Sequence, residues 1–401
     1  MTLGPGGLVL RRPAFRRLFI AHAISRAGDA FNTVALVVLV FGLTGSGLGV
    51  AGTVAFEVAP ILLVGPIAGL AADRLPRRTL MVGADILRAA LAALLAVSHS
   101  SVGLAYGVAF GLSTGSVFFN PAAASLVPEV VDDEELVAAN SALWTVAVVA
   151  QVVFAPLAGA LIAGVGVGAA FGLNALSFVA SAAVLVGLRA GRTPAAAIGA
   201  RSWQGISEGL SVVRSSPLLS RLAIVQPLAA LSAGATGGLL VVLAEERLAV
   251  GAPGFGVLLA AIGGGAVAGP LVLGRFVRPG ARRWLYGPLV LRGGVDLGLA
   301  WTTSAAAAGG ALAAYGVGTS TGTVAFQSTV QTEVASERRG RTFALFDLLW
   351  NSARLVSLGL GGVLADAAGI RAVYLLGGAL LLAAAAVGFT GPARADRSSR
   401  A

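Results

Sequence analysis

The sequence predicts an all-α membrane protein whose twelve transmembrane helices form two pseudo-symmetric six-helix bundles. Three observations lead to this fold class: an apolar composition, arginines confined to alternate loops, and an internal repeat. Hydrophobic residues make up 57% of the 401 residues and charged residues only 11%, against about 25% in an ordinary soluble domain. So few polar residues cannot coat a soluble particle of this size, and most of the chain must face lipid or other helices.

Apolar runs of membrane-spanning length recur along the whole chain. A helix needs about 20 apolar residues to cross the hydrocarbon of a bilayer. Arginine clusters and Gly, Pro and Ser breaks place the spans near 17–43, 47–72, 79–98, 101–126, 137–164, 167–188, 218–244, 254–276, 284–303, 305–331, 342–365 and 370–390. We therefore expect an N-terminal bundle over 1–188, a linker over 189–217, a C-terminal bundle over 218–390 and a tail over 391–401.

The central linker is the longest polar stretch between the spans. Within it Trp203, Ile206, Leu210 and Val213 recur at helical spacing. This pattern is typical of an amphipathic helix that lies on the inner membrane surface. An ordinary solvated connector explains the stretch equally well, and both interpretations stay open.

Arginines occupy every second loop. Clusters precede the first span, follow the second, fill the linker, follow the eighth, precede the eleventh and end the chain, whereas the opposite loops hold only Arg247 and Arg371. This positive-inside bias predicts a plasma (inner) membrane protein with both termini in the cytoplasm. The first residues lack a small-residue cleavage site, so we expect the N-terminus to be retained. The same distribution argues against a nucleic-acid partner, despite the net charge of +10.

An internal repeat supports two parallel halves. The segment that begins Val127-Pro-Glu129 enters the fifth span, and the segment that begins Val330-Gln-Thr-Glu333 enters the eleventh span in the same way, about one half-length later. Two related halves of six spans are an arrangement found in secondary transporters.

Several kinds of chemistry lack the residues that they need. The chain has no cysteine, which excludes disulfides and thiol nucleophiles. It has no lysine, which excludes a P-loop and a Schiff base. Only His22 and His99 offer an imidazole, so a multi-histidine metal site is absent. We therefore expect no cofactor, no metal and no enzymatic activity.

Ionisable residues inside spans are costly and point to function. Asp29 in the first span, Glu57 in the second and Arg88 in the third each lie roughly 15 to 18 Å from a helix end, at about 1.5 Å of rise per residue. A buried carboxylate whose surroundings change can take up a proton on one side and release it on the other. We expect these residues to serve proton coupling. Static i, i+3 pairing, of Asp29 with Arg26 and of Arg88 with Asp85, is the alternative.

Other polar residues in the spans are candidates for substrate contacts. The second half offers Arg292 and Asp296, for which self-paired packing is the favoured interpretation. Amides beside prolines could bind a substrate or bridge helices. The substrate or cavity candidates are Arg26, Asn120, Gln151, Gln226, Asp347, Asn351 and Arg354.

The loop between the second and third spans carries the most informative motif. Its residues Gly69, Asp73, Arg74, Arg77 and Arg78 read G-x-x-x-D-R-x-x-R-R, which is similar to the loop signature of major facilitator superfamily transporters. In that family such residues latch the two halves in the outward-facing state. The resemblance implies a conformational latch here, with the start of the eleventh span as its partner.

A second set of motifs extends the resemblance over nearly the whole chain. Ala155, Pro156 and Gly159 in the fifth span look like a degraded antiporter motif. Three further segments resemble those of the macrolide-efflux and enterobactin-exporter-like branch. They are Phe15-Arg-Arg-Leu-Phe, Gly28-Asp29 and Asp85-Ile-Leu-Arg88. Members of that branch are proton-driven exporters. The arginine of the family's fourth-span motif is missing, and Arg88 is its nearest candidate substitute.

The resemblance and the buried charges together favour a proton-coupled antiporter that exports small amphiphilic molecules such as drugs, antibiotics or siderophores by alternating access. Its expected partners are the substrate, protons and the lipid bilayer, and we expect a monomer. An importer or uniporter of a polar metabolite is the main alternative. A membrane sensor or enzyme is the remote one.

Overall fold

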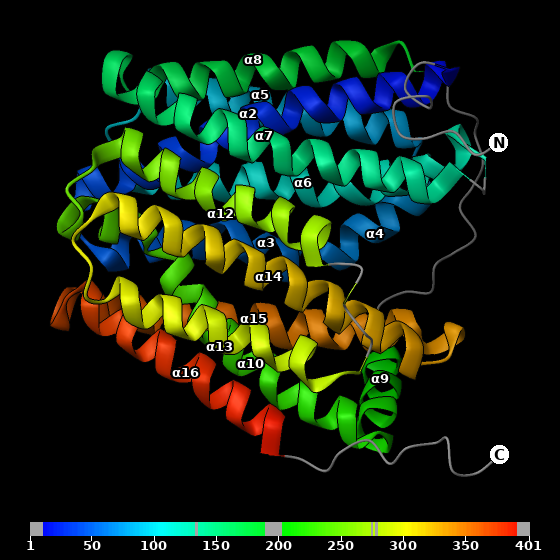
Figure 1. The fold of residues 1–401 in the computed structure, drawn as a ribbon. Helices are drawn as coiled ribbons and strands as arrows, with labels where there is room; N and C mark the ends of the chain where they lie inside the picture. Colours follow the sequence, from blue (N-terminus) through cyan, green and yellow to red (C-terminus); the bar gives the residue numbers. More distant parts are fainter. Residues whose placement is uncertain (1–10, 133–134, 189–202, 274–275, 277–279, 391–401) are drawn as a thin grey trace.

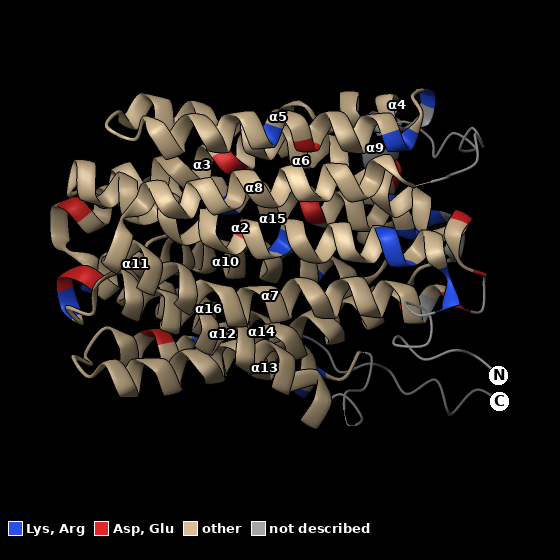
Figure 2. Cartoon of the chain, turned by 90° about the horizontal axis from the view of Figure 1, so that it is seen from above, with Lys and Arg blue, Asp and Glu red and all other residues tan. Residues whose placement is uncertain are grey.

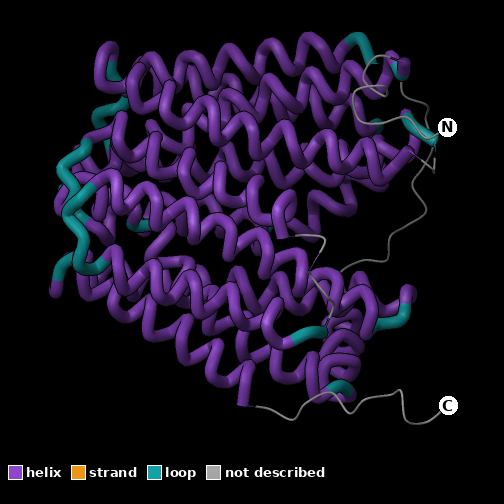
Figure 3. Tube along the Cα trace, in the orientation of Figure 1, coloured by secondary structure: helices purple, strands orange, loops and turns teal. Residues whose placement is uncertain are grey.

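The structure, a computed structural model, describes residues 11–132, 135–188, 203–273, 276 and 280–390. The expected tail and the first part of the linker, 189–202, lie outside these ranges. The described residues are almost entirely helical and include no strand. Figure 1 shows the long helices lying side by side along one direction, and Figure 3 shows short loops at the two ends. The all-α prediction is confirmed.

The first half follows the predicted spans closely. Its helices are α2 (Pro13–Thr44), α3 (Gly47–Leu63), α4 (Gly65–Arg74), α5 (Arg77–Val97), α6 (Val102–Val130), α7 (Leu136–Val165) and α8 (Val167–Val186). The second span is the exception, because it consists of the two helices α3 and α4 with a break at Val64. Pro66 follows the break, and a proline lacks the N–H that would continue the hydrogen-bond ladder.

The second half has one further break. Its helices are α9 (Trp203–Ser215), α10 (Pro217–Gly238), α11 (Leu240–Val242), the π-helix η2 (Leu243–Arg247), α12 (Gly251–Leu273), α13 (Arg282–Leu299), α14 (Ala305–Glu333), α15 (Ser336–Ala368) and α16 (Ile370–Thr390). The seventh span breaks at Leu239, directly after two glycines, which are weak helix formers. Pro227, by contrast, lies inside the continuous helix α10.

Nine helices within the described ranges are long and apolar enough to cross a membrane by themselves. The other three predicted spans are α3 with α4, α13 and α14. The first is divided by its break, α13 carries Arg282, Arg283, Arg292 and Asp296, and α14 is rich in Gly, Ser and Thr. Each of these helices still packs among the other spans, which accounts for twelve spans in total.

Charged residues distinguish the two ends of the bundle. Helices α2, α5, α13 and α15 begin with arginines at the end where α16 finishes, and we call this the arginine-rich end. Arg247 and Arg371 are the arginines described at the opposite, arginine-poor end. Figure 2 also shows a few charged positions part-way along helices. The alternation predicted from the sequence is therefore present in the described part of the chain.

The two halves use the same helix pairings. In the first half α2 packs against α7 and α8, and α5 packs against α6 and α8. In the second half α10 packs against α15 and α16, and α13 packs against α14 and α16. Counting α3 with α4 as the second span, these are equivalent pairs of spans, six positions apart. The repetition explains the pseudo-symmetry that the internal repeat predicted.

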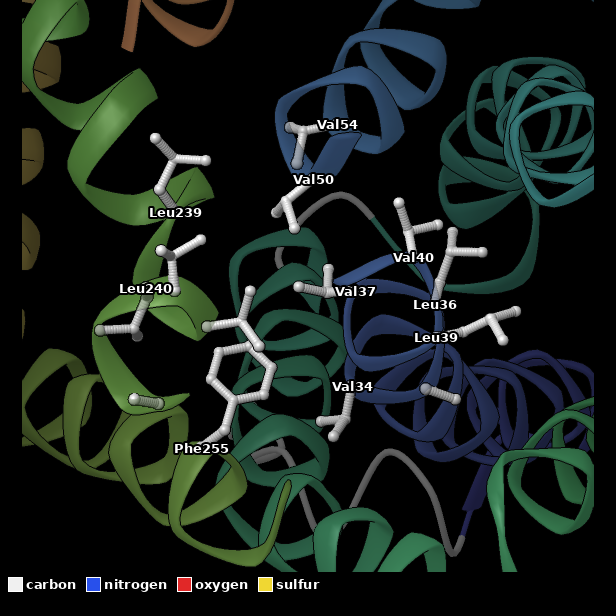
Figure 4. Close-up of a cluster of buried hydrophobic side chains, with 14 of the residues drawn as sticks. Val34, Leu36, Val37, Leu39, Val40, Val50, Val54, Leu239, Leu240 and Phe255 are labelled. Carbon is white, nitrogen blue, oxygen red and sulfur yellow. The ribbon is translucent and has the colours of Figure 1, made fainter. Parts of the chain in front are cut away.

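Two main crossings join the halves: α3 packs against α15, and α7 packs against α12. At the arginine-poor end one apolar cluster runs through both halves. Figure 4 shows Val50 and Val54 of the first half facing Leu239, Leu240 and Phe255 of the second. At the arginine-rich end each half instead has an apolar cluster of its own. The described cores therefore connect the halves at one end only.

The linker does contain a helix, α9, and this helix packs against α15 and α10. Val213 is buried in the apolar cluster of the second half. Glu208 forms an ion pair with Arg341 of α15, and Gly209 lies so close to Arg341 that a Cβ there would meet its carbonyl oxygen at 2.8 Å. The side chains of Trp203 and Ile206 lie outside the described residues. By its contacts α9 belongs to the second half.

Candidate functional site

A partly open cavity of about 230 Å³ lies among the helices of the first half. Five helices, α2, α3, α5, α6 and α8, contribute to its wall. The residues that line it are Arg26, Asp29, Asn32, Thr33, Glu57, Arg88, Ala109, Leu112, Ser113, Ser116, Asn174 and Phe178. The structure thus brings Asp29, Glu57 and Arg88, which the sequence places on three different spans, to one cavity.

Helix α2 supplies a loosely held charge pair. Arg26 and Asp29 stand one turn apart and their side chains approach to 3.5 Å, with about a third of each exposed (36% and 32%). The Nε of Arg26 also approaches Nε2 of His22 at 3.4 Å. Thr33 donates to the backbone oxygen of Asp29, one turn earlier on the same helix. The predicted i, i+3 contact is present, but its length and exposure leave the Asp29 carboxylate accessible from the cavity.

Helix α3 supplies the second carboxylate. Glu57 is half-buried, and Ser113 of α6 donates to its backbone oxygen at 2.5 Å. The Glu57 side chain interacts electrostatically with Asp29 across the cavity and with Arg354 of α15 in the other half. Glu57 is therefore placed where the relative position of the two halves changes its electrostatic surroundings.

Helix α5 supplies a fixed cation. Arg88 is buried, forms an ion pair with Asp85, and stacks between Phe119 and Phe178, whose ring centres lie 4.6 and 4.4 Å from its guanidinium carbon. Asp85 is fully buried and also accepts a hydrogen bond from Ser181 at 2.7 Å. Arg88 still interacts electrostatically with Asp29. The ion pair between Arg88 and Asp85 agrees with the alternative of static i, i+3 pairing. Arg88 also lines one side of the cavity.

In the second half, α13 is the counterpart of α5, and the contacts of its Arg292 and Asp296 differ from those that we expected. Arg292 and Asp296 on α13 do not form an ion pair with each other among the described residues. Arg292 donates to the Tyr315 hydroxyl at 2.7 Å, and Asp296 accepts from Ser232 at 3.2 Å. Tyr315 and Ser232 belong to the neighbouring helices α14 and α10. Arg292 and Asp296 still interact electrostatically, but their described hydrogen bonds run to other helices.

Of the other substrate candidates, Arg26 lines this cavity and Arg354 interacts with Glu57 of its wall, whereas the remaining ones do not line it. Asn120 is exposed on α6 and Gln151 is half-buried on α7. Gln226 is half-buried on α10. On α15 the amide of Asn351 donates to the backbone oxygen of Asp347 at 2.9 Å, within its own helix. Their role in substrate binding stays a prediction.

The predicted latch residues lie at the arginine-rich end. Gly69 and Asp73 belong to α4, and the side chain of Asp73 lies outside the described residues. Arg74 and Arg78 are exposed. Arg77 forms an ion pair with Glu129 of α6. The described contact of the motif is thus made within the first half, whereas the start of α15 is bonded to α9.

The residues of the antiporter-like motif form a close crossing between the halves. A Cβ on Gly159 would meet the carbonyl oxygen of Ala252 at 2.2 Å, and a Cβ on Gly256 would meet that of Ala155 at 2.3 Å. Pro156 lies on α7 between Ala155 and Gly159. Small residues let helix backbones approach in this way. In this structure the motif joins α7 to α12.

Sequence reasoning missed two amides of the cavity. Asn32 lies on α2, three residues after Asp29, and Asn174 lies on α8, where it is fully buried. The signal that could have found them is the spacing of Asn32 from Asp29 on one helix face, and the presence of a lone amide in an otherwise apolar sixth span.

Comparisons with known proteins identify the family. The family model described as transmembrane secretion effector, within the major facilitator superfamily, matches residues 7–399. An uncharacterised transporter of this superfamily from Bacillus subtilis, YfiS, is 27% identical over 395 residues, which cover 93% of each chain. Macrolide efflux protein A of Streptococcus pyogenes is 27% identical over 126 residues, 30% of this chain and 31% of that protein.

Solved structures agree on the fold. A bacterial homologue of the lysosomal transporter Spinster superposes with a TM-score of 0.75 at 14% identity, over 94% of this chain and 95% of that one. The nucleoside transporter NupG gives 0.75 at 12% identity, over 94% and 98%. The predicted superfamily is thus confirmed: this chain belongs to the transmembrane secretion effector family of the major facilitator superfamily, a family of multi-pass membrane transporters.

Proposed function

We propose that this protein is a proton-coupled exporter of small amphiphilic organic molecules. It works by alternating access of its two halves in the plasma membrane, as a monomer with both termini in the cytoplasm. The observation that carries the proposal is the cavity of the first half, which is lined by the two carboxylates of Asp29 and Glu57 and by Arg26 and Arg88. Carboxylates at membrane depth are costly to maintain, and a proton relay is one of the functions that they serve.

The coupling follows from the place of Glu57 between the halves. Its electrostatic partner Arg354 belongs to α15, so a rocking motion of one half against the other changes the distance between their charges. The affinity of a carboxylate for a proton depends on such a neighbouring charge and on access to water. A proton bound from one side of the membrane is then released to the other, and substrate moves in the opposite direction.

Two observations favour amphiphilic cargo and export. The chain has few tyrosines and tryptophans (four and five) to line a site for a polar metabolite. The relative from Streptococcus pyogenes is named as a macrolide efflux protein, although the match spans less than a third of it. Drugs, antibiotics and siderophores are the cargo classes that we expect.

Transport into inverted proteoliposomes with an imposed pH gradient tests the proposal. The probes are a radiolabelled macrolide antibiotic and the lipophilic cation ethidium. We expect gradient-driven uptake by the wild type and its loss in Asp29→Asn and Glu57→Gln. Asp296→Asn, which neutralises a buried carboxylate of the second half, is the matched control and should keep uptake. Uptake by both first-half variants at the wild-type rate would refute the coupling assignment.

A counterflow experiment separates export from the alternative of uniport. Preloaded vesicles exchange labelled for unlabelled probe without a pH gradient in either mechanism. Only a coupled exporter concentrates the probe when the gradient is imposed. Probe flux that never exceeds equilibration would favour a uniporter instead.

A further inference from the structure

The cavity of the first half contains buried amide groups that the protein itself does not satisfy. Asn174 is fully buried, and neither its Oδ1 nor its Nδ2 has a hydrogen-bond partner among the described residues. The same holds for Oδ1 of Asn32 and for Nε of Arg88. Buried polar groups almost always have partners, because leaving them unpaired costs free energy. These atoms therefore point to a polar occupant of the cavity.

The hydroxyl groups around the cavity are arranged to accept further hydrogen bonds. Thr33, Ser113 and Ser116 each donate their proton to a backbone oxygen, those of Asp29, Glu57 and Leu112. Ser116 Oγ already accepts from Nη1 of Arg88 at 3.4 Å, whereas among the described residues no donor reaches the hydroxyl oxygens of Thr33 and Ser113. Arg88 Nε and Asn174 Nδ2 offer donors, and the carboxylates and amide oxygens offer acceptors. An occupant that both donates and accepts fits this mixture, whereas a bare cation would face two arginines.

The size and lining of the cavity suit water molecules. Pockets for drug-sized ligands measure about 300 to 1,000 Å³. The cavity has about 230 Å³, and every residue of its wall belongs to the first half, whereas substrates of a two-half transporter need a path between the halves. A water molecule takes about 30 Å³ in the liquid and binds with two to four polar partners. The cavity is thus polar and roomy enough for several waters.

We propose that this cavity holds a chain of ordered water molecules that carries protons between Asp29 and Glu57, and that Asn32 and Asn174 are the positioning residues that hold the chain. A proton leaves the carboxyl group of one residue, passes along the O–H···O bonds of the waters, and protonates the carboxylate of the other. Only O–H bonds break and form, so the step balances without any co-reactant. The inference rests on the proposed function in taking these two carboxylates as proton sites.

The presence of water can be tested without any transport. Hydroxyl-radical footprinting of the full chain in lipid nanodiscs modifies buried side chains that lie beside bound water. Phe178 lines the cavity although only 1% of it is exposed. Phe171, on the same helix and equally buried, does not line it, and is the matched control. We expect Phe178 to be modified about tenfold faster than Phe171, since ordered water bridges buried polar groups. Equal rates would overturn the proposal, because the cavity would be dry.

The role of the amides is tested by Asn174→Leu, which is close to isosteric and apolar, and by Asn174→Ser, which keeps a hydrogen-bonding group. We expect Asn174→Leu to lower gradient-driven uptake by about tenfold, the effect of removing one partner from a buried polar network, and to leave counterflow at equal pH unchanged. Asn174→Ser should restore uptake. Asn32→Leu should likewise lower driven uptake and leave counterflow unchanged. This second variant tests the proposal even if Asn174→Leu fails to fold.

The outcomes distinguish the two proposals. Uptake in Asn174→Leu and Asn32→Leu at the wild-type rate, together with its loss in Asp29→Asn and Glu57→Gln, would refute the relay and keep the coupled exporter. Unchanged uptake in the two carboxylate variants would refute the proposed function itself, whatever the footprinting shows. An equal loss of counterflow and of driven uptake in the amide variants would refute the relay by indicating a substrate-binding role.

Discussion

The two ends of the molecule hold the halves together in different ways. At the arginine-poor end one apolar cluster runs through both halves, and Asp366 of α15 accepts hydrogen bonds from the backbone of Gly47 and the hydroxyl of Ser46, both at 2.6 Å, at the start of α3. At the arginine-rich end the clusters are separate, and the ion pairs of Arg77 and Arg341 stay within one half each.

The contacts between the halves close the arginine-poor end. Contacts between the halves form an apolar core and a charge-assisted cap at the arginine-poor end, while the described contacts of the other end would survive a separation of the halves. We infer that the structure represents the state with access from the arginine-rich end. Because the chain has no cysteine, spin labels can report on each end separately. Exposed sites are Val97 and Val363 at the arginine-poor end, and Leu75 and Leu271 at the other.

The largest effect is expected at the crossing of α7 and α12. Gly159→Leu places a side chain where Ala252 carbonyl oxygen lies 2.2 Å from a Cβ. Overpacking of this kind costs about 1 to 3 kcal/mol, which here acts against the closed end. We expect distances between labels at Val97 and Val363 to lengthen. Gly164→Leu on the same helix is the control, since a Cβ there meets nothing within 4 Å. Equal distances between the labels in the two variants would show that this crossing does not hold the two halves together at the arginine-poor end.

The second effect concerns the cap that Asp366 forms on α3. The first N–H groups of a helix have no partner within it, and here Asp366 accepts those of Gly47 and Leu48, the latter at 3.3 Å. Asp366→Ala should raise the population that is open at this end by about tenfold, in keeping with the loss of hydrogen bonds to a charged group. Asp366→Asn keeps an acceptor and should have a smaller effect. The distance distribution between labels at Val97 and Val363 measures both, and identical distributions in wild type and Asp366→Ala would contradict the idea.

The sequence could predict the helices and the buried charges, because both depend on local properties. Apolar length and arginine position placed the twelve spans, and depth along a helix singled out Asp29 and Glu57. Partners across helices were beyond its reach. Arg292 and Asp296 interact electrostatically, as their spacing predicts, but their hydrogen-bond partners Tyr315 and Ser232 lie on other helices and could not be predicted. A lone amide in the sixth span could mark Asn174, but its lack of hydrogen-bond partners could not be predicted, since that depends on every neighbouring helix.

A third, smaller effect is expected from the ion pair between Arg341 and Glu208. About half of each side chain is exposed (50% and 48%), and exposed pairs contribute about 0 to 1 kcal/mol. Arg341→Ala should therefore leave the distances between labels at both ends unchanged and lower the thermal unfolding midpoint only slightly. A lengthening at the arginine-rich end would show that α9 restrains the halves after all, and would weaken the contrast between the ends.

The smallest expected effect is a dependence of stability on pH that comes from Glu246 at the closed end. Glu246 of η2 is largely exposed, but partial burial of its carboxyl group, together with the nearby charge of Asp366, raises its pKa above the ordinary value of 4.5. A raised pKa means that the folded protein binds this proton more tightly than the unfolded chain does. The resulting stabilisation is complete below the ordinary pKa and is lost as the pH rises through the folded pKa.

The variant Glu246→Gln removes that dependence, so its unfolding midpoint should match the wild type near about pH 4 and exceed it increasingly toward about pH 7. Because Asp366 contributes to the shift, the gain should be smaller when Glu246→Gln is made in an Asp366→Asn background. A gain of the same size in both backgrounds would mean that burial alone acts on Glu246. The carboxylate of Asp366 would then be fully engaged with the start of α3, which would strengthen its assignment as the contact that closes this end.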